Sequence, residues 1–542
     1  MDRKILMLVA LVAAASATAQ ETYENARIAT EDLNGTARYV GMGGALDALG
    51  ADLSTIGTNP AGIGLFRHSQ AKISFGFVSQ QDARDFDNAN KTNMSFDQVG
   101  FVYSMRNGRK SFVNFAFNYH KSTNFNQILS AANVLSGASQ NKLSYLKGAG
   151  GLFSVGPNDK GDLVGDNNMF NSVDYLYYNA FLTTHDEDGV PSYGYNDATA
   201  YAFNRASSGY IGEYDFNISG NIDDRLYLGL TVGIHDVNYN GYSEYSENLV
   251  SSEGTPVGSV AIGDERIISG TGFNIKFGMI FRPIENSPFR IGFSASTPTW
   301  YDLSTRSHTV LANNTDLGEY DSGTSDEAYD FKLYTPWKFG LSLGTTFGNY
   351  LAVGASYDYA NYGKLDTRIN DGGGYDWYYG DYYESSSSDK AMNSHTDRTL
   401  KGVSTLKVGL EFKPDAALAI RLGYNYVSPM YNKNGYKDYT VDSPGTYYTS
   451  STDYTNWKAT NRITCGLGYS VKKFSFDVAY QYSVQNGDFH PFTDFGSPCP
   501  TVRETWPRRP TLATSATRCS SPWDMLSDDT ASCLMDGEGH AA

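Results

Sequence analysis

Cysteine is scarce in this sequence and unevenly distributed. Four of the 542 residues are Cys, and three of them, Cys499, Cys519 and Cys533, come after residue 496. Because Cys465 is the only thiol before that point, no disulfide can form within the long first part. The three late thiols have no regular spacing, so they do not predict a disulfide framework either.

Long apolar runs and an excess of basic residues are also absent. After residue 14 no segment reaches the roughly 20 apolar residues of a membrane-spanning helix, and the mean hydropathy is −0.41. Both observations exclude a helical membrane protein. The net charge of −17 argues against a nucleic-acid partner, because such binding depends on Lys and Arg that neutralise phosphates.

The one long apolar run lies at the start of the chain. Arg3 and Lys4 precede the apolar residues 5–14, and Ala17-Thr18-Ala19 supplies the small residues of a cleavage site. This pattern predicts a secretory signal peptide over residues 1–19, so that the mature chain begins at Gln20 and is exported. No Cys follows the cleavage site, so the pattern does not predict a lipid anchor.

Residues 71–484 repeat a unit in which every second side chain is apolar or aromatic. Successive side chains of a strand point to opposite faces, so each unit has one apolar and one polar face. This is typical of a transmembrane β-barrel, where one face meets lipid and the other a wet lumen. A soluble β-sandwich or propeller also alternates. In one unit, Val113, Phe115, Phe117 and Tyr119 alternate with Asn114, Ala116, Asn118 and His120.

The connections between the units favour the barrel. Short turns, such as Asn107-Gly108 with its type I′ signal, alternate with long polar loops. Outer-membrane barrels have short periplasmic turns and long extracellular loops, whereas a sandwich has no reason for this sorting. We expect thirteen strands around residues 71–78, 96–106, 113–119, 214–218, 226–234, 273–281, 289–293, 337–343, 351–357, 406–412, 418–424, 463–469 and 474–482.

The polar strand faces carry charges of both signs. On the lipid side each charge would cost about 2 to 4 kcal/mol near the middle of the bilayer. The acidic run 371–397 would suit a divalent ion or lipopolysaccharide, although a solvated loop is the more frequent structure for such a run. We expect the following side chains to point into the lumen: Asn274, Lys276, Arg290, Lys407, Glu411, Arg421, Arg462 and Asp477.

Residues 20–70 separate the signal peptide from the first strand and are not strand-like. In a barrel of this size such a segment is expected to fold into the lumen as a plug. Glycine would let this plug move, and it equally permits tight static packing. The candidate plug and gating residues are Gly41, Gly43, Gly44, Asn59, Pro60, Ala61 and Gly62.

The plug segment is rich in small residues and ends in Asn59-Pro60-Ala61-Gly62, directly before an aromatic-rich barrel. In this respect the chain resembles the FadL/TodX family of outer-membrane transporters for hydrophobic compounds. Residues 335–341 and 421–426 also resemble later strands of that family. The resemblance implies an all-β fold, a transmembrane antiparallel β-barrel of about 14 strands with an N-terminal plug. It also implies passive passage of long-chain fatty acids, aromatic hydrocarbons or similar ligands from an outer groove through a lumenal pocket, often leaving sideways into the bilayer.

The expected organisation follows from these features. The signal peptide covers residues 1–19, the plug 20–70, the barrel with its long extracellular loops 71–496, and an aberrant tail 497–542. The expected location is the outer membrane. The expected partners are a hydrophobic ligand, membrane lipid, lipopolysaccharide and the barrel-assembly machinery.

The long loop after the third strand contains apolar residues at roughly helical spacing. We expect two short amphipathic helices there, which would either form a groove that captures a ligand or pack on the barrel rim. The candidate groove residues are Phe125, Ile128, Leu129, Val134, Leu135 and Leu146.

Other functions have weaker support in the sequence. His120 and His235 fall on inward faces, but no His or Cys spacing supports a metal or haem site, and nothing resembles a nucleophile elbow. We therefore expect no metal, no cofactor and no catalytic residue. An outer-membrane lipase or protease stays open as an alternative, as does a non-transporting barrel such as an adhesin or a secretion-machinery component.

The alternation stops after about residue 496, and the tail shows no amphipathic strand. A barrel with both ends in the periplasm needs an even number of strands, and an open edge in lipid is costly. Over residues 518–527, a shifted reading frame permits an alternating strand that ends in Phe. We therefore expect the fourteenth strand to be missing from this chain or to lie in another frame.

Overall fold

The computed structural model describes residues 21–493, apart from positions 88, 286, 319, 377 and 379, and the backbone of 511–521. At 375, 376 and 381–384 it describes the backbone alone. The expected signal peptide and most of the tail lie outside the described residues. Among the described residues, no helix is long and apolar enough to span a membrane.

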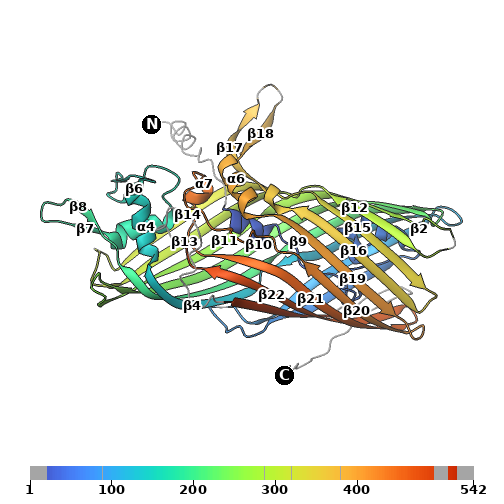
Figure 1. The fold of residues 1–542 in the computed structure, drawn as a ribbon. Coiled ribbons are helices and arrows are strands. Elements are labelled where there is room, and N and C mark those ends of the chain that lie inside the picture. The colour runs from blue at the N-terminus through green and yellow to red at the C-terminus, as the bar shows by residue number, and fades with distance from the viewer. Residues whose placement is uncertain are drawn as a thin grey trace, which may run out of the picture.

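One antiparallel sheet of nineteen strands curls into a barrel (Figure 1). Its strands are β1 Gln70–Gln80, β2 Thr92–Arg106, β3 Phe112–Asn124, β4 Gln127–Ala138, β9 Asp197–Ile222, β10 Leu226–Val250, β11 Pro256–Phe281, β12 Arg290–Ser296, β13 Trp300–Thr315, β14 Ser322–Tyr334, β15 Lys338–Phe347, β16 Leu351–Asn361, β17 Asp366–Asp376, β18 Asp381–Ser388, β19 Gly402–Phe412, β20 Leu418–Val427, β21 Tyr454–Val471, β22 Phe474–His490 and β23 Thr511–Ser521.

The described strands occupy fourteen positions around the barrel. Five positions each hold two consecutive strands: β3 with β4, β12 with β13, β14 with β15, β16 with β17, and β18 with β19. All thirteen strands that the sequence predicts are present, in β1, β2, β3, β9, β10, β11, β12, β15, β16, β19, β20, β21 and β22. The fold class, an all-β transmembrane barrel of about 14 strands, is confirmed.

The fourteenth position differs from the expectation. The backbone of β23 pairs with β22, from Ala479↔Ser520 to Asp488↔Thr511, and with β1, from Phe75↔Ser521 to Gln80↔Ala516. The expectation that this chain lacks a closing strand is therefore wrong, since the backbone of β23 closes the barrel. Strand pairing uses main-chain N–H and C=O groups, so a segment without side-chain alternation still closes an edge. The frameshift stays a prediction.

The short turns lie at one end of the barrel, as expected. Asp223 and Asp224 adopt positive φ values of 52° and 56° between β9 and β10, and Lys472 has a φ of 55° between β21 and β22. Asn107-Gly108 does not form the expected two-residue turn. The β2–β3 connection is longer, and the Asn107 N–H donates to the Ser111 carbonyl at 2.9 Å.

The two faces of the wall separate as the alternation predicts. Side chains such as Phe216, Leu341 and Ile463 lie exposed on the outside, at 51%, 59% and 62%. The eight polar residues expected to point inward are buried, except Arg290, which is half-buried. Buried polar side chains on an interior strand face and exposed apolar ones outside are the arrangement of a barrel in lipid.

The N-terminal segment lies inside the barrel, where Figure 1 shows it in dark blue. It consists of α2 Thr22–Ile28, α3 Ala37–Gly41 and two 3-10 helices, η1 Leu53–Gly57 and η2 Pro60–Leu65. Side-chain caps begin each of them: Glu21 accepts from the Tyr23 N–H, Thr36 from Tyr39, Asp52 from Ser54 and Asn59 from Ala61. These caps satisfy one N–H group at the start of each helix. Other backbone groups of the segment bond the wall, as the Asp32 N–H does with the Ser122 carbonyl at 2.8 Å.

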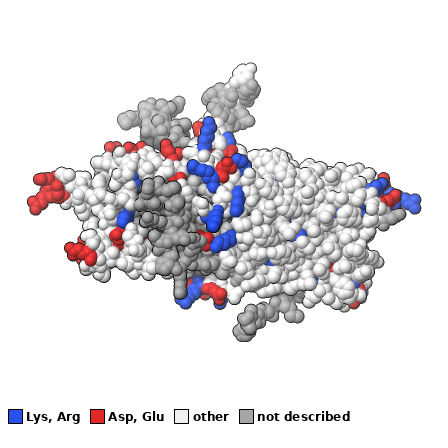
Figure 2. Space-filling view, in the orientation of Figure 1, with Lys and Arg blue, Asp and Glu red and all other residues white. Residues whose placement is uncertain are grey.

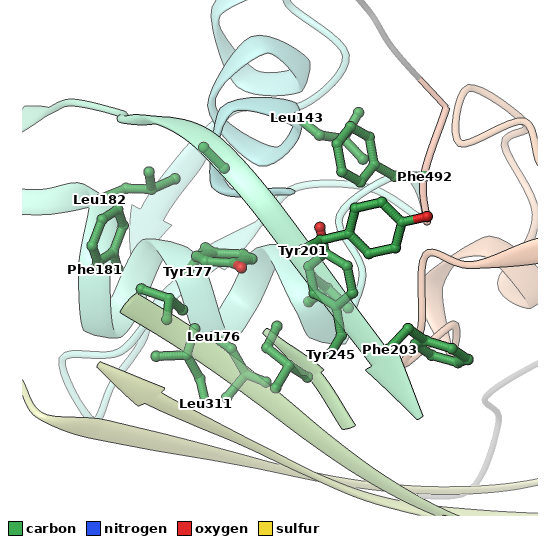
Figure 3. Close-up of a cluster of buried hydrophobic side chains, with 14 of the residues drawn as sticks. Leu143, Leu176, Tyr177, Phe181, Leu182, Tyr201, Phe203, Tyr245, Leu311 and Phe492 are labelled. Atoms are coloured by element: carbon green, nitrogen blue, oxygen red, sulfur yellow. The ribbon is translucent and has the colours of Figure 1, made fainter. Parts of the chain in front are cut away.

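A folded cap covers the outer end of β9, β10 and β13. It contains β4, α4 Gln140–Ala149, β5 Val155–Pro157, β6 Leu163–Gly165, α5 Ser172–Tyr177, a π-helix η3 Tyr178–Leu182, β7 Thr183–His185 and β8 Pro191–Tyr193. Tyr177 of α5, Tyr201 of β9 and Tyr245 of β10 pack in its apolar core (Figure 3).

The structure tests two loop expectations. The first expected helix, near residues 125–135, is the strand β4, because its pairing with β9 outweighs an ambiguous apolar spacing. The second is the helix α4. The run 371–397 forms parts of the hairpin β17–β18 and of the helix α6 Lys390–Thr399, and most of its described side chains are exposed, as expected for a solvated segment.

Candidate functional site: the lumenal cavity and its side gap

A cavity of about 640 Å³ lies between the N-terminal segment and the barrel wall. This volume falls within the range of ordinary ligand pockets, about 300 to 1,000 Å³. Ile28, Phe125 and Ile268 give it apolar surface, and Arg27 and Lys276 give it charge. The lining therefore combines apolar side chains with charged groups of both signs.

Arg27 shows how the plug positions charge in this cavity. It is held by Tyr239, whose hydroxyl accepts from Nη1 at 2.8 Å and whose ring lies 4.8 Å from the guanidinium carbon. Its Nη2 donates to the Ser207 hydroxyl at 2.7 Å. The guanidinium is therefore fixed by the wall and faces the cavity without a carboxylate partner among these contacts.

The Asn-Pro-Ala-Gly motif packs against a strip of wall glycines. Ideal Cβ atoms on Gly229 and Gly278 would lie 2.4 Å from the Pro60 carbonyl carbon and 2.2 Å from Asn59 Oδ1, closer than any real Cβ contact. Asn59, Pro60, Ala61 and Gly62 are all buried. Only glycine in the wall lets the plug backbone approach this closely.

The glycines of the first plug half make similar contacts. Gly43 and Gly44 have φ values of +62° and +82°, which L side chains rarely adopt. Gly41 faces Gly466 of β21, where its ideal Cβ would lie 3.2 Å from the Gly466 Cα. Gly41, Gly43, Asn59, Pro60 and Ala61 therefore lie at the interface of plug and wall. Gly44 packs against Leu33 and Tyr39, and Gly62 against Thr55, so these two glycines lie within the plug itself. Whether they also gate the channel is a proposal.

Buried ion pairs fix the plug to the wall. Arg38 of α3 donates to Glu411 of β19 at 3.0 and 3.2 Å. Arg421 of β20 is fully buried and bonds Glu411 at 2.6 Å and also Asp477. Removing one member would leave an unpaired buried charge, which is strongly destabilising. These charges therefore hold the plug in one position.

A second charged cluster lies beneath η1. Lys276 bonds Glu213 and, at 3.3 Å, Asp215, and His120 lies 3.5 and 3.3 Å from these two carboxylates. His235 lies 3.5 Å from Glu213 and 3.0 Å from the Tyr301 hydroxyl.

The cluster has a plausible donor set for a metal ion, since the ligand atoms of His120, Glu213 and Asp215 lie within 4.8 Å of one another. However, the Lys276 ammonium already lies between the two carboxylates and supplies the positive charge that a metal would bring. The cluster is therefore better understood as an internal ion network of the wall. Both histidines point inward, as the strand pattern predicts.

The wall has a gap where the cavity reaches it. Backbone pairing of β2 with β3 ends at Gln98↔His120. Before Gln98, β2 pairs only with β1. After His120, β3 and then β4 pair only with β9. Residues from both sides, including Val78 and Asn93 on one side and Asn124 on the other, line the cavity.

Side chains bridge this gap in place of backbone bonds. Gln80 of β1 accepts from the Ile128 N–H at 2.8 Å and donates to the Ile128 carbonyl at 2.6 Å. Lys121 reaches the Ser95 hydroxyl at 3.4 Å. Side-chain bridges of this kind can break without disrupting the sheet, so this is the part of the wall best suited to open.

The structure separates the six predicted groove residues. Phe125 and Ile128 line the cavity, and Phe125 packs edge-on against Tyr239 at 5.3 Å. Leu129 and Leu135 belong to the cap core. Val134 is 57% exposed and Leu146 is half-buried. They do not form one continuous groove, because β4 turns alternate residues to opposite sides.

Sequence reasoning did not identify the wall glycines or the gap residues. A signal for the glycines was present: Gly229, Gly278, Gly409 and Gly423 occupy inward positions of predicted strands, where glycine marks a close backbone approach. No local signal identified the gap, because it depends on which strand each segment pairs with.

Solved structures with a similar arrangement include the toluene transporter TbuX of Ralstonia pickettii, at 13% identity over 91% of this chain and 98% of that chain, with a TM-score of 0.46. The P. putida toluene transporter TodX is 11% identical over 92% and 99%, with a TM-score of 0.47. A Pseudomonas aeruginosa FadL homologue is 12% identical over 92% and 98%, with a TM-score of 0.45. These structures come from the family that the plug motif resembles.

No family model matches the sequence, and no curated protein matches it. The fold assignment therefore rests on the strand pairings of this chain.

Proposed function

We propose that this protein is an outer-membrane channel for the passive passage of hydrophobic small molecules, such as long-chain fatty acids or aromatic hydrocarbons. The observation that carries the proposal is the gap between β2 and β3, which joins the lumenal cavity to the wall. A plugged barrel without such a gap would offer an apolar ligand no path into the bilayer. The mixed lining of the cavity supports a ligand with a large apolar part.

The proposed path begins at the cap and ends in the membrane. Phe125 and Ile128 contact the ligand as it enters the cavity, and Leu129 and Leu135 support the cap that surrounds the entrance. The ligand leaves between β2 and β3 when the bridges of Gln80 and Lys121 open. The gating role of Asn59 and the plug glycines belongs to the same proposal.

A pair of variants on β2 tests the path. Asn93 lines the cavity at the gap, and its neighbour Met94 is 66% exposed on the lipid side. Asn93→Trp should block the gap, whereas Met94→Trp adds the same bulk outside. The measurement is uptake of a labelled long-chain fatty acid and of a labelled aromatic hydrocarbon by Gram-negative cells that lack their own channel for these compounds.

The expected result is uptake with the unchanged chain and with Met94→Trp, and a loss of most uptake with Asn93→Trp. If cells that make the unchanged chain take up neither compound faster than cells without it, the transport proposal is wrong. Equal uptake by both Trp variants would leave transport standing and reject the gap as its exit.

A second candidate function is supported by the cap. Its core of buried side chains is large for a set of loops, and it projects beyond the barrel (Figures 1 and 3). A rigid extracellular surface of this kind would suit an adhesin or a component of a secretion machine. Absence of uptake, together with retained cap structure, would favour this candidate.

A further inference from the structure

Part of the barrel wall is only as tall as a bilayer. β16 and β19 have 11 residues each and β20 has 10, which is the length of a tilted strand that crosses a membrane, about 9 to 11 residues. On the lipid side these strands expose aromatic and apolar side chains up to Tyr359 and Leu406. The residues directly beyond Asn361, Gly402 and Val427 therefore lie at the level of the outer lipid headgroups.

Five exposed basic residues lie at this level, and we call them the basic patch: Lys364, Lys390, Arg398, Lys401 and Lys433. Lys364 ends the 3-10 helix η4 Tyr362–Lys364 after β16, Lys390 and Arg398 belong to α6, Lys401 precedes β19, and Lys433 follows β20. Figure 2 shows blue atoms gathered on this part of the surface, beside the white belt of the barrel.

Backbone and side-chain contacts hold the segments of the patch together. The Lys401 N–H donates to the Met430 carbonyl at 2.9 Å, and the Asn432 side chain donates to the Arg398 carbonyl at 2.6 Å. The Lys364 ammonium bonds Asp397 at 2.9 Å. The basic residues from three separate strand ends are therefore parts of one fixed surface.

The charge of the patch is opposite to that of the whole chain. Asp397 is exposed and offsets Lys364, but Asp389 is buried, where it caps α6 and accepts from Ser443 at 2.6 Å. The patch therefore keeps a positive charge in a chain whose net charge is −17. A cationic surface at headgroup level attracts anionic lipid, and Lys and Arg bond phosphate oxygens strongly.

We propose that the basic patch binds the phosphate groups of a phosphorylated glycolipid of the lipid A type in the outer leaflet. The phosphates contact Arg398, Lys401 and Lys433 with Lys390 beside them, and the acyl chains lie along the exposed Tyr359 and Leu406 of the wall below. This surface is separate from the proposed transport path, which opens between β2 and β3. Lipid binding at the patch would fix the height of the barrel in the membrane.

The test uses the full chain folded in detergent and purified lipid A with both phosphates as the probe. In the patch variant, Lys390, Arg398, Lys401 and Lys433 are each changed to Gln. The matched control changes Arg109, Lys110, Lys472 and Lys473 to Gln; these four are also exposed but lie in the short turns at the other end of the barrel. Native mass spectrometry counts bound lipid, and heat-dependent electrophoretic mobility confirms that each variant is folded.

We expect lipid A to bind the unchanged chain and the control equally, and to bind the patch variant at least about tenfold more weakly. Added salt should weaken the binding. Dephosphorylated lipid A should bind as weakly as the patch variant binds lipid A, and inorganic phosphate at the same phosphate concentration should not compete. Equal binding by the patch variant, equal binding of dephosphorylated lipid, or displacement by inorganic phosphate would each overturn the proposal.

Discussion

At the scale of single residues, the lumen is arranged around charge pairs. Glu213, Asp215 and Lys276 are nearly inaccessible to solvent and lie within bonding distance of one another. A buried charge is tolerated only when partners and hydrogen bonds compensate it. The identity of each residue therefore depends on the others, and no single position can be changed to a neutral residue without cost.

Lys276→Met tests this dependence. The change removes the positive charge between two buried carboxylates and should lower the free energy of unfolding by about 3 to 5 kcal/mol. Urea unfolding in detergent, followed by tryptophan fluorescence, measures the loss. The double variant Lys276→Met with Glu213→Gln should recover part of it. A loss below about 1 kcal/mol in the single variant would show that the carboxylates are compensated in another way.

At the scale of elements, the plug and wall fit through backbone contacts. Tyr424 lies against Gly43, and Ala479 of β22 packs with Ala37 and Val40 of α3. A plug held in this way can leave the lumen only if α3 separates from β22. The proposed gating role of the plug can therefore be tested by linking these two elements.

The link is a disulfide between Val40→Cys and Ala479→Cys, in a chain whose own cysteines are changed to Ser. The native side chains form one small buried cluster, so the two thiols should be close enough to join. If the plug must move, uptake should fall on oxidation and return on reduction. The reduced form of the same variant is the control. Equal uptake in both states would show that ligands pass with the plug in place.

A carboxyl group in the cap predicts a pH dependence. Glu247 lies near the outer end of β10, well beyond the roughly 11 residues that cross a bilayer. It accepts from the backbone N–H of Gln140 at the start of α4 at 2.6 Å and from the Tyr245 hydroxyl at 2.5 Å. Burial raises the pKa of Glu247 from its ordinary value of 4.5 to about 7.

A raised acid pKa stabilises the fold at low pH. The contribution is fully present below the unfolded pKa of 4.5 and is lost as the pH rises through about 7. Amide hydrogen exchange of α4, corrected for the intrinsic rate, should therefore become faster between pH about 5 and about 8. Glu247→Gln stays neutral and should remove this dependence. A pH dependence that persists in the variant would assign it to another group.

The elements differ in how far the sequence predicts them. The thirteen strands were predictable because a period of two is a local property of each segment. The segment 127–138 was not, since its apolar residues fit either a helix or a strand and the pairing with β9 decides. The gap was not predictable either, because it arises where β3 changes from two partners to one. The burial of the plug motif followed from its small residues, but its position against Gly229 and Gly278 required the structure.

At the scale of the whole molecule, the decisive contact is the one that closes the barrel. β1 and β22 would each present an unpaired edge to lipid if β23 were absent, and an unsatisfied backbone group there costs several kcal/mol. The tail sequence has no apolar alternation, whereas the backbone of residues 511–521 supplies the pairing. The closing strand is thus held to both neighbours by main-chain pairing.

Two truncations and one replacement test this view. Removing residues 522–542 leaves β23 intact and should not change folding, whereas removing 511–542 deletes β23 and should abolish the heat-modifiable band of a folded barrel. In the replacement, the alternating strand of the shifted frame, which ends in Phe, takes the place of the tail. This variant should have a higher folded fraction than the unchanged chain, because the new strand pairs the same edges and also presents an apolar face to lipid. If the replacement folds no better, the lipid-facing pattern of the last strand is dispensable, and the frameshift prediction loses its physical basis. If the chain that lacks residues 511–542 folds normally, β1 and β22 close the barrel without β23.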